Sequence, residues 1–407
     1  MTRAAVAFVL ALGGLALPAQ SRLVTRYAAG VGGALDVMTF HGAGVEQFGF
    51  AGLDSVRVRR ASQLTIPVAL AASLGAGWRL DVTALHAMGQ VTFDDARTGA
   101  SRRVTLRGTS DVRLRATGRV LFDGLVATVG VNAPTGRTNL DDGEYSALRV
   151  LVAPALALGS TPVGTGPSGI LGLVASRLMG PWTVALGGSF EHRGRYQPVA
   201  ALTAGTDAAD FRPGSVVRTS MAAERLVGAH RLNLGVAADV FREDRLRGVA
   251  EGATPGSQQV ALATVQLGPV LTADAQLQVG SRRWREVVVY ASSLWRAPYA
   301  RDGITVTGSS GQYVEGGVRA ARPLRRGTDI VLATAGRWHG GLASDQGLAT
   351  RAVRAGDVTI GLRSSSGLLA VQPYVRAQAG VLGSRGGELP SRGFHGFTSG
   401  VVLQGRF

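Results

Sequence analysis

The chain ends with the segment GFHGFTSGVVLQGRF, residues 393–407, and this segment decides the predicted fold. Apolar Val401 and Leu403 alternate with polar Gln404, and the last residue is the aromatic Phe407. Because successive side chains of a strand point to opposite faces, the segment has one apolar face and one polar face. Strands that cross a membrane have this pattern, whereas soluble domains rarely end in this way. We therefore predict a membrane-spanning strand and expect the same alternation upstream.

The terminal strand resembles the C-terminal signal that the bacterial barrel-assembly machinery recognises. The resemblance implies an all-β fold, a transmembrane antiparallel up-and-down β-barrel in the cell outer membrane. It also implies the barrel-assembly machinery as a partner, engaged through the C-terminal strand.

The first residues have the organisation of a secretory signal. Arg3 is followed by an apolar stretch, 4–17, and by the small-residue cleavage site Leu17-Pro18-Ala19. This predicts a signal peptide over 1–19 and a barrel over 20–407. An N-terminal membrane anchor is the alternative, but the apolar stretch is shorter than the roughly 20 residues that a spanning helix needs. The chain contains no cysteine, which excludes a lipoprotein anchor and a disulfide framework.

Charge is strongly unbalanced, with 43 basic and 27 acidic residues and a formal net charge of +16. A basic chain raises nucleic acid as a partner. Here every basic residue is arginine, and the arginines are dispersed rather than clustered with aromatic residues. We therefore predict no nucleic-acid binding, and expect arginines to face a polar lumen or the phosphate groups of outer-membrane lipid and lipopolysaccharide.

Alternating segments recur along the chain, and we count about 16 of them, with 14 as the alternative if 24–40 and a neighbour are lost. An even number is typical of outer-membrane barrels. The predicted strands are 24–40, 55–74, 77–93, 108–121, 125–133, 168–178, 181–193, 214–226, 230–242, 259–278, 284–298, 309–322, 328–340, 355–364, 367–380 and 394–407.

Tight turns alternate with longer polar links, so all tight turns fall at one rim. Barrels place short turns in the periplasm and long loops outside. The predicted outer links are 41–54, 94–107, 134–167, 194–213, 243–258, 299–308, 341–354 and 381–393.

The polar face of the predicted strands is rich in arginine. Turning it toward lipid would cost roughly 2–4 kcal/mol for each arginine near the midplane, so this face must line the lumen. The lumen and transport residues that we predict are Arg57, Arg59, Arg113, Arg115, Arg119, Arg231, Asp239 and Arg376.

Three tryptophans, Trp78, Trp182 and Trp284, directly follow short turns. With Phe407, they are predicted to form an aromatic belt at the membrane interface.

The link 134–167 is too long for a plain loop. Asp141 precedes Glu144 at capping-box spacing, and apolar residues follow at helical spacing until Pro154. We predict a short helix over 141–153, with two open alternatives: it narrows or plugs the lumen, or it lies over the rim. The predicted constriction residues are Glu144, Tyr145, Leu148 and Arg149.

No motif indicates a cofactor or a metal site. The glycine-rich stretch 164–169 lacks a preceding buried strand, and the histidines have no metal-type spacing. His192, His339 and His395 are predicted near the outer rim, and they leave a rim hydrolase as one alternative.

The segments VGVNAPTGRT, residues 129–138, and LMGPW, residues 178–182, resemble patterns in outer-membrane channels. They are similar to the broad group of long-chain fatty-acid and aromatic-hydrocarbon transporters and the porin-like proteins of phenol-degradation operons. This resemblance covers about residues 55–200 and the C-terminal strand. It implies passive uptake of small, often hydrophobic molecules, with an obstructed lumen and no cofactor. The chain departs from the fatty-acid transporters in lacking a distinct N-terminal plug domain.

The leading functional prediction is an outer-membrane channel or passive transporter for small solutes, either hydrophobic or anionic. A structural or surface-interaction barrel with a closed lumen is the second alternative, and the rim hydrolase is the third.

Overall fold

The computed structural model describes residues 24–42, 56–95, 98–153, 156–158, 163–199, 209–248, 260–281, 283–340, 352–383 and 391–406. The predicted signal peptide, Pro154 and Phe407 lie outside the described residues.

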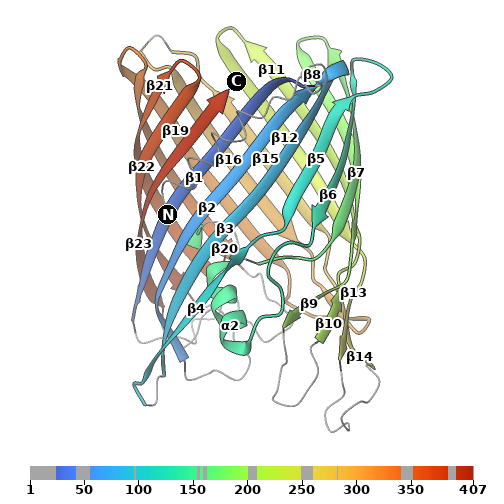
Figure 1. The fold of residues 1–407 in the computed structure, drawn as a ribbon, viewed down its shortest axis with the longest axis vertical. Helices are drawn as coiled ribbons and strands as arrows, with labels where there is room; N and C mark the ends of the chain where they lie inside the picture. Colours follow the sequence, from blue (N-terminus) through green and yellow to red (C-terminus); the bar gives the residue numbers. More distant parts are fainter. Residues whose placement is uncertain are drawn as a thin grey trace.

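A closed antiparallel barrel forms most of the molecule (Figure 1). Its two segments β4 and β5 both pair with β3, so they form one interrupted strand and the barrel has 16 strands, as predicted. The barrel elements are β1 (Val24–His41), β2 (Val56–Leu74), β3 (Trp78–Asp95), β4 (Ser101–Thr109), β5 (Val112–Arg119), β6 (Leu125–Ala133), β7 (Ser168–Met179), β8 (Trp182–Arg193), β11 (Val216–Val227), β12 (His230–Phe241), β15 (Val270–Gln278), β16 (Glu286–Arg296), β19 (Gly311–Arg325), β20 (Thr328–Gly340), β21 (Ala352–Ser366), β22 (Leu369–Gly383) and β23 (Arg392–Arg406).

The C-terminal strand closes the barrel. β23 pairs with β22 on one side and with β1 on the other, from His41 opposite Gly393 to Ala28 opposite Arg406. Its side chains Phe397 and Leu403 are exposed to 48% and 36%, whereas Thr398 is buried. The alternation predicted for this strand is confirmed, and the even-numbered face points inward.

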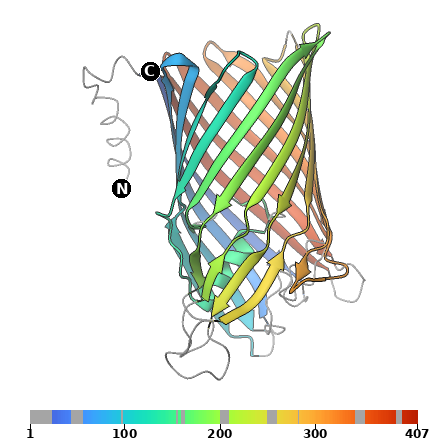
Figure 2. The same ribbon diagram turned by 90° about the vertical axis from the view of Figure 1, so that its right-hand side faces the viewer.

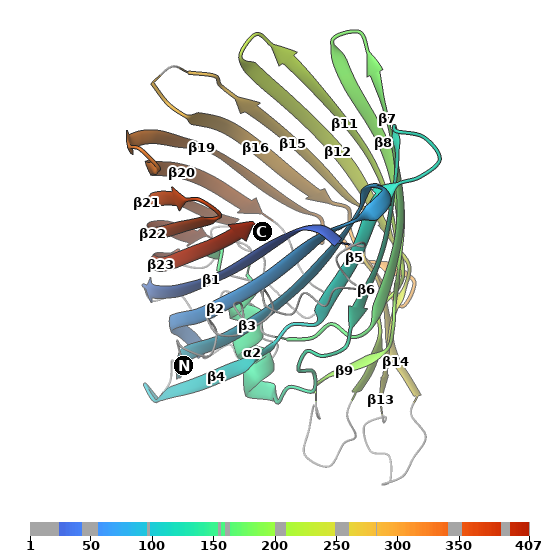
Figure 3. The same cartoon turned by 45° about the horizontal axis from the view of Figure 1, so that its top comes forward.

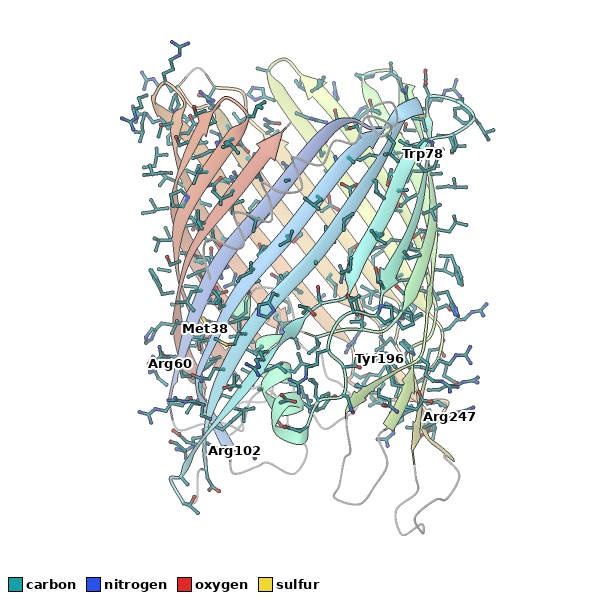
Figure 4. The ribbon with its side chains drawn as sticks, viewed as in Figure 1. Met38, Arg60, Trp78, Arg102, Tyr196 and Arg247 are labelled. Carbon is teal, nitrogen blue, oxygen red and sulfur yellow. The ribbon has the colours of Figure 1, made fainter. Side chains whose placement is uncertain are left out.

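Apolar side chains continue around the outward face. Exposed leucine, valine and isoleucine residues recur on alternate positions of strands such as β12, β21 and β22. Trp78 and Trp182 lie on this face next to the short turns, and Figure 4 labels Trp78 at that end of the barrel. The outward apolar band and the closed hydrogen-bonded wall are the two features that allow strands to cross a membrane.

The long-loop end departs from the predicted links. Most of β4 falls in the predicted link 94–107, and its last two residues fall in the predicted strand 108–121, because the β3–β4 hairpin extends beyond the rest of the wall. The predicted strand 259–278 is two strands, β14 (Val260–Gln266) and β15, since Gly268 and Pro269 interrupt it.

A second sheet of six strands, the outer sheet, is built from five segments that we predicted as loops and from β14 (Figure 2). Its strands are β9 (Tyr196–Val199), β10 (Ala209–Arg212), β13 (Asp244–Gly248), β14, β17 (Ala300–Arg301) and β18 (Ile304–Thr305).

Glycines mark the bend between the barrel and the outer sheet. A Cβ atom at Gly214 would lie 2.0 Å from the backbone oxygen of Arg242, and one at Gly268 would lie 2.1 Å from that of Ala297. Only glycine permits these close backbone approaches. The outer sheet therefore continues the wall of β8, β11, β12, β15 and β16 through a bend.

Two helical elements are described, the 3₁₀ turn η1 (Gly75–Gly77) and the α-helix α2 (Asp142–Leu151). Neither helix of the described chain has the length and hydropathy of a membrane span.

Candidate functional site in the lumen

Helix α2 begins with the predicted capping box. The Asp141 carboxylate accepts a hydrogen bond from the Glu144 backbone N–H at 2.8 Å, and the Glu144 carboxylate accepts one from the Asp141 N–H at 3.2 Å. Arg137 also pairs with Glu144 at 2.6 Å. These contacts satisfy backbone donors of the first turn and fix its direction. The helix extends over 142–151, slightly shorter than the predicted 141–153.

The helix lies inside the barrel, against the wall. A Cβ atom at Gly89 on β3 would lie 2.3 Å from Leu151 Cδ1, so the end of the helix packs directly on this glycine. Gly89 alternates with the outward residue Met88, and therefore faces the lumen. Figure 3, in which the short-turn end comes forward, shows α2 next to β3 and β4. Of the two alternatives, the luminal position is the one that the structure adopts.

We call the part of the lumen beside β21–β23 and β1–β4, at the long-loop end, the packed sector. Inward side chains of these strands are apolar there and bury α2 and the residues after it. The buried members are Met38, Phe40, Val58, Ala61, Val91, Phe93, Val104, Leu106, Val353, Leu382 and Phe394 from the wall, and Leu140, Ala147, Val150, Leu151 and Leu156 from the link 134–167, which we call the inserted segment.

Polar side chains anchor the segment that follows the helix. Arg376 on β22 donates to the Ala157 carbonyl at 2.9 Å and pairs with Asp36 at 3.2 Å. Gln378 donates to the Leu156 carbonyl at 3.1 Å. The Asp36 carboxylate is only 3% exposed and also accepts a bond from Thr398 Oγ1 at 2.6 Å. A buried charge that is paired in this way holds the chain firmly, because breaking one contact would leave the other groups unsatisfied.

The part of the lumen beside β5–β8, β11, β12, β15 and β16 is called the open sector. Arg113 and Arg115 stand opposite Thr83 and Asp81 on the lumen face that also carries Gly89. Both arginine side chains are exposed.

Other predicted lumen residues line the same sector in ion pairs. Arg231 pairs with Glu224 at 2.5 Å, Asp239 with Arg218 at 2.7 Å, and Arg119 with Asp123 at 3.0 Å. The pairs make the inward face of the open sector polar and balance much of its charge.

Arg57 and Arg59 are not lumen residues, in contrast to the prediction. Val58 and Ala61 are an odd number of residues apart, so in a regular strand they would point to opposite faces. A bulge in β2 lets both face the buried cluster. Arg57 therefore stands opposite Asp94 on the outward side, and Arg59 is exposed at the bulge. A single extra residue in a strand reverses the alternation beyond it.

The four predicted constriction residues have different surroundings. Tyr145 and Leu148 pack against the apolar cluster, Glu144 belongs to the capping box, and the Arg149 guanidinium lies 6.0 Å from the centre of the Tyr145 ring. Their role in narrowing the lumen stays a prediction.

The rim histidines do not form a complete catalytic arrangement among the described residues. His192 Nδ1 lies 3.4 Å from Ser215 Oγ on the outward face, without a bonded carboxylate, and His395 stacks on His41 with ring centres 4.5 Å apart. Across the described part of the chain, no group of three potential ligands could hold a metal ion.

Sequence reasoning missed the wall of the packed sector. The sequence does contain a signal for it, because apolar residues occupy the inward positions of β3 and β4. Val91 and Phe93 flank an outward threonine, and so do Val104 and Leu106. An apolar residue on the lumen side is unfavourable beside water and indicates that another part of the chain covers it.

A closed barrel with an apolar outer band and a polar, partly filled interior defines the class of this protein: it is a β-barrel of the bacterial outer membrane.

No family model and no curated protein matches the chain. Solved barrels do align along nearly its whole length. OprB of Pseudomonas putida aligns with a TM-score of 0.45 and 11% identity over 97% of both chains. TodX, a monoaromatic hydrocarbon channel, aligns with a TM-score of 0.44 and 9% identity over 94% of this chain and 90% of its own. A FadL homologue of Pseudomonas aeruginosa aligns with a TM-score of 0.42 and 9% identity over 93% of this chain and 90% of its own.

Among them, TodX is described as a channel, and the set falls in the broad group that the sequence resembles. The TM-scores and identities are low, so the likeness is one of barrel architecture and assigns no solute.

Proposed function

We propose that this protein is a passive channel whose solute path follows the open sector and is narrowed by the helix α2. The observation that carries the proposal is the contrast in exposure across the lumen. Inward residues such as Arg115, Gln276 and Arg218 are exposed, with Arg218 near the long-loop end of β11, whereas the inward residues beneath α2 are buried. A barrel closed along its whole interior, the structural alternative, would bury both sets.

Weak anion preference is expected of this path. Most inward arginines have an acidic partner, including Arg218, Arg231 and Arg337. Arg113 and Arg115 have no ion pair within the described residues, and Asp81 opposite Arg115 is bonded to Arg79 at 2.7 Å. The local excess of positive charge attracts anions in a confined, polar passage.

Planar-bilayer recording of the purified protein tests the proposal. We expect steady conductance from wild-type protein, and a reversal potential in a salt gradient that moves toward the non-selective value when Arg113 and Arg115 are both replaced by serine. Arg103→Ser is the control, because Arg103 is exposed on the outward face of β4. Folding is checked by the shift in electrophoretic mobility on heating.

Absence of both conductance and solute flux in folded protein would reject the channel and favour the closed structural barrel. An unchanged reversal potential in the double variant would remove the two arginines from the proposal while leaving the path itself in place.

The rim hydrolase is not proposed, because no observation favours it over the polar surface that His192 and Ser215 otherwise form.

A further inference from the structure

An outward patch of arginines lies just beyond the apolar band, on the side of the barrel that carries the outer sheet. The patch comprises Arg195, Arg212, Arg242, Arg245 and Arg247. None of these residues belongs to the lumen, so the patch has no part in the proposed channel function.

Register determines the direction of these side chains. Arg212 stands opposite Arg245, and Asp210 opposite Arg247, on one face of the outer sheet. Phe211 lies on the other face, where it meets the Tyr196 ring edge to face at 5.6 Å. Tyr196 contacts Gly166 of the inserted segment, so its face is the inner one. The arginine face therefore points away from the barrel axis, and Figure 4 labels Arg247 and Tyr196 at this end of the molecule.

Acidic neighbours balance only part of this charge. Arg195 pairs with Asp210 at 3.1 Å and Arg245 pairs with Glu243 at 3.0 Å. Arg212, Arg242 and Arg247 have no acidic partner within the described residues. Five guanidinium groups therefore face two carboxylates, and three positive charges remain for a ligand.

A hollow of about 490 Å³ accompanies the patch, at the bend between the barrel and the outer sheet. It is lined by Phe190, His192, Arg212, Ser215, Arg242 and Arg245, among others. Phe190 belongs to the outward apolar face of β8 and is 43% exposed. The hollow thus has an apolar wall toward the membrane and a basic wall beyond it, which fits an amphiphile with an anionic head.

Arginine suits phosphate among anionic groups, because its planar fork can donate two parallel hydrogen bonds to phosphate oxygens. With the long loops outside, as the alternation of links predicts, the patch lies at the level of the outer-leaflet head groups. The phosphorylated lipid of that leaflet is lipopolysaccharide. We propose that this arginine patch binds a phosphate group of lipopolysaccharide, and that Phe190 and the adjoining apolar surface contact its acyl chains.

Binding to detergent-purified protein tests the site directly. The probe is purified lipopolysaccharide, and the test variant replaces Arg212, Arg242 and Arg247 with serine, leaving the two ion-paired arginines in place. The control variant replaces Arg60, Arg103 and Arg354, three exposed outward arginines at the same end of the barrel but away from the outer sheet. Both variants lose the same formal charge.

We expect the test variant to bind lipopolysaccharide roughly tenfold or more weakly, because three charge-assisted contacts are lost, and the control to stay within about twofold of wild type. Enzymatic removal of the phosphates should reduce wild-type binding to the level of the test variant. Inorganic phosphate at millimolar concentration should not displace the lipid.

Three results would overturn the proposal. One is equal binding by wild-type protein and the test variant when the heat-dependent mobility shift reports both as folded. Another is an equal loss in the control variant, which would indicate general charge attraction. The third is equally tight binding of phosphatidylglycerol vesicles, which would assign the patch to any anionic lipid.

Discussion

The packed and open sectors of the lumen follow the same backbone rule and carry opposite side chains. Both are lined by every second residue of antiparallel strands. In the packed sector those residues include Met38, Val91 and Phe394 and are buried, whereas in the open sector they include Arg115 and Gln278 and are exposed. Alternation therefore identifies the membrane-facing wall, and the chemistry of the inward row indicates where the chain covers that wall from inside.

Placing a charge on the buried face of α2 should have the largest effect. We expect Leu151→Asp to destabilise the seated helix by more than about 5 kcal/mol, because it removes a buried side chain and introduces a carboxylate without a partner. The helix should leave the wall and single-channel conductance should rise severalfold. Val152→Asp is the matched control, since Val152 is the next residue and is 42% exposed. Equal conductance of both variants would show that the packed sector does not limit the path.

Removing one arginine from each sector should separate them further. Arg376→Met leaves Asp36 buried without its charge partner and is expected to cost about 3–5 kcal/mol. Arg218→Met breaks the Arg218–Asp239 pair, in which the arginine is 51% exposed, and is expected to cost at most about 1 kcal/mol. Urea unfolding of each variant in lipid vesicles measures the difference. Similar losses would mean that the two sectors are equally accessible to water.

Adding a methyl group tests how closely each sector is packed. At Gly89 the new Cβ would meet Leu151 Cδ1 at 2.3 Å, and at Gly235 it would meet Asp274 Oδ1 at 2.5 Å. Leu151 is buried and Asp274 is exposed, so only Asp274 can move aside freely. We expect Gly89→Ala to cost about 1–3 kcal/mol and Gly235→Ala much less. The same unfolding assay applies, and a larger loss at Gly235 would contradict the assignment of the open sector.

The smallest expected effect concerns Asp244 of the outer sheet, a carboxyl group that is partly buried. Burial raises the pKa of this carboxyl above its usual value, despite a 2.5 Å hydrogen bond from the Gly214 N–H. Because the folded state holds this proton more tightly than the unfolded state, protonation stabilises the fold. This contribution is complete below the pKa of the unfolded state and is lost as the pH rises through the pKa of the folded state. Asp244→Asn keeps an acceptor oxygen without the charge.

The stability of the Asn variant relative to wild type should therefore increase from about pH 4 to pH 7, by no more than about 1.4 kcal/mol for each unit of pKa difference. Unfolding midpoints at several pH values check this. A constant difference would indicate that water reaches Asp244.

Sequence reasoning succeeded best for strands that have lipid on one side. Residues 125–133 and 328–340 were predicted with the bounds that the structure has, because their outward residues must be apolar in every register that the membrane permits. The capping box of α2 was likewise readable, since Asp141 and Glu144 are close in the chain.

The failures have one physical cause, which is contact between distant segments. The partners of Arg376 are Asp36 and Ala157, and no local pattern connects them. The bulge at Arg59 changes the faces of β2 without any glycine or proline to mark it. The strands of the outer sheet are short, and they acquire their order only by pairing with one another.

The segment before α2 has a second role, in the wall itself. Among the strands that the structure describes, β4 pairs only with β3 and β9 only with β10, so each has a free edge on the side that faces the other. Residues before the helix bond to both edges: the Arg137 N–H donates to the Thr109 carbonyl at 3.3 Å, and the Asn139 and Leu140 N–H groups donate to the Gln197 and Pro198 carbonyls at 2.7 and 3.0 Å.

Removing the inserted segment from an engineered protein would therefore do more than widen the pore. Deleting the segment would leave two unpaired strand edges, which invite pairing with other chains. Enlarging the passage safely requires weakening the contacts of Leu151 while keeping residues 137–140, so that porosity and wall integrity can be adjusted separately.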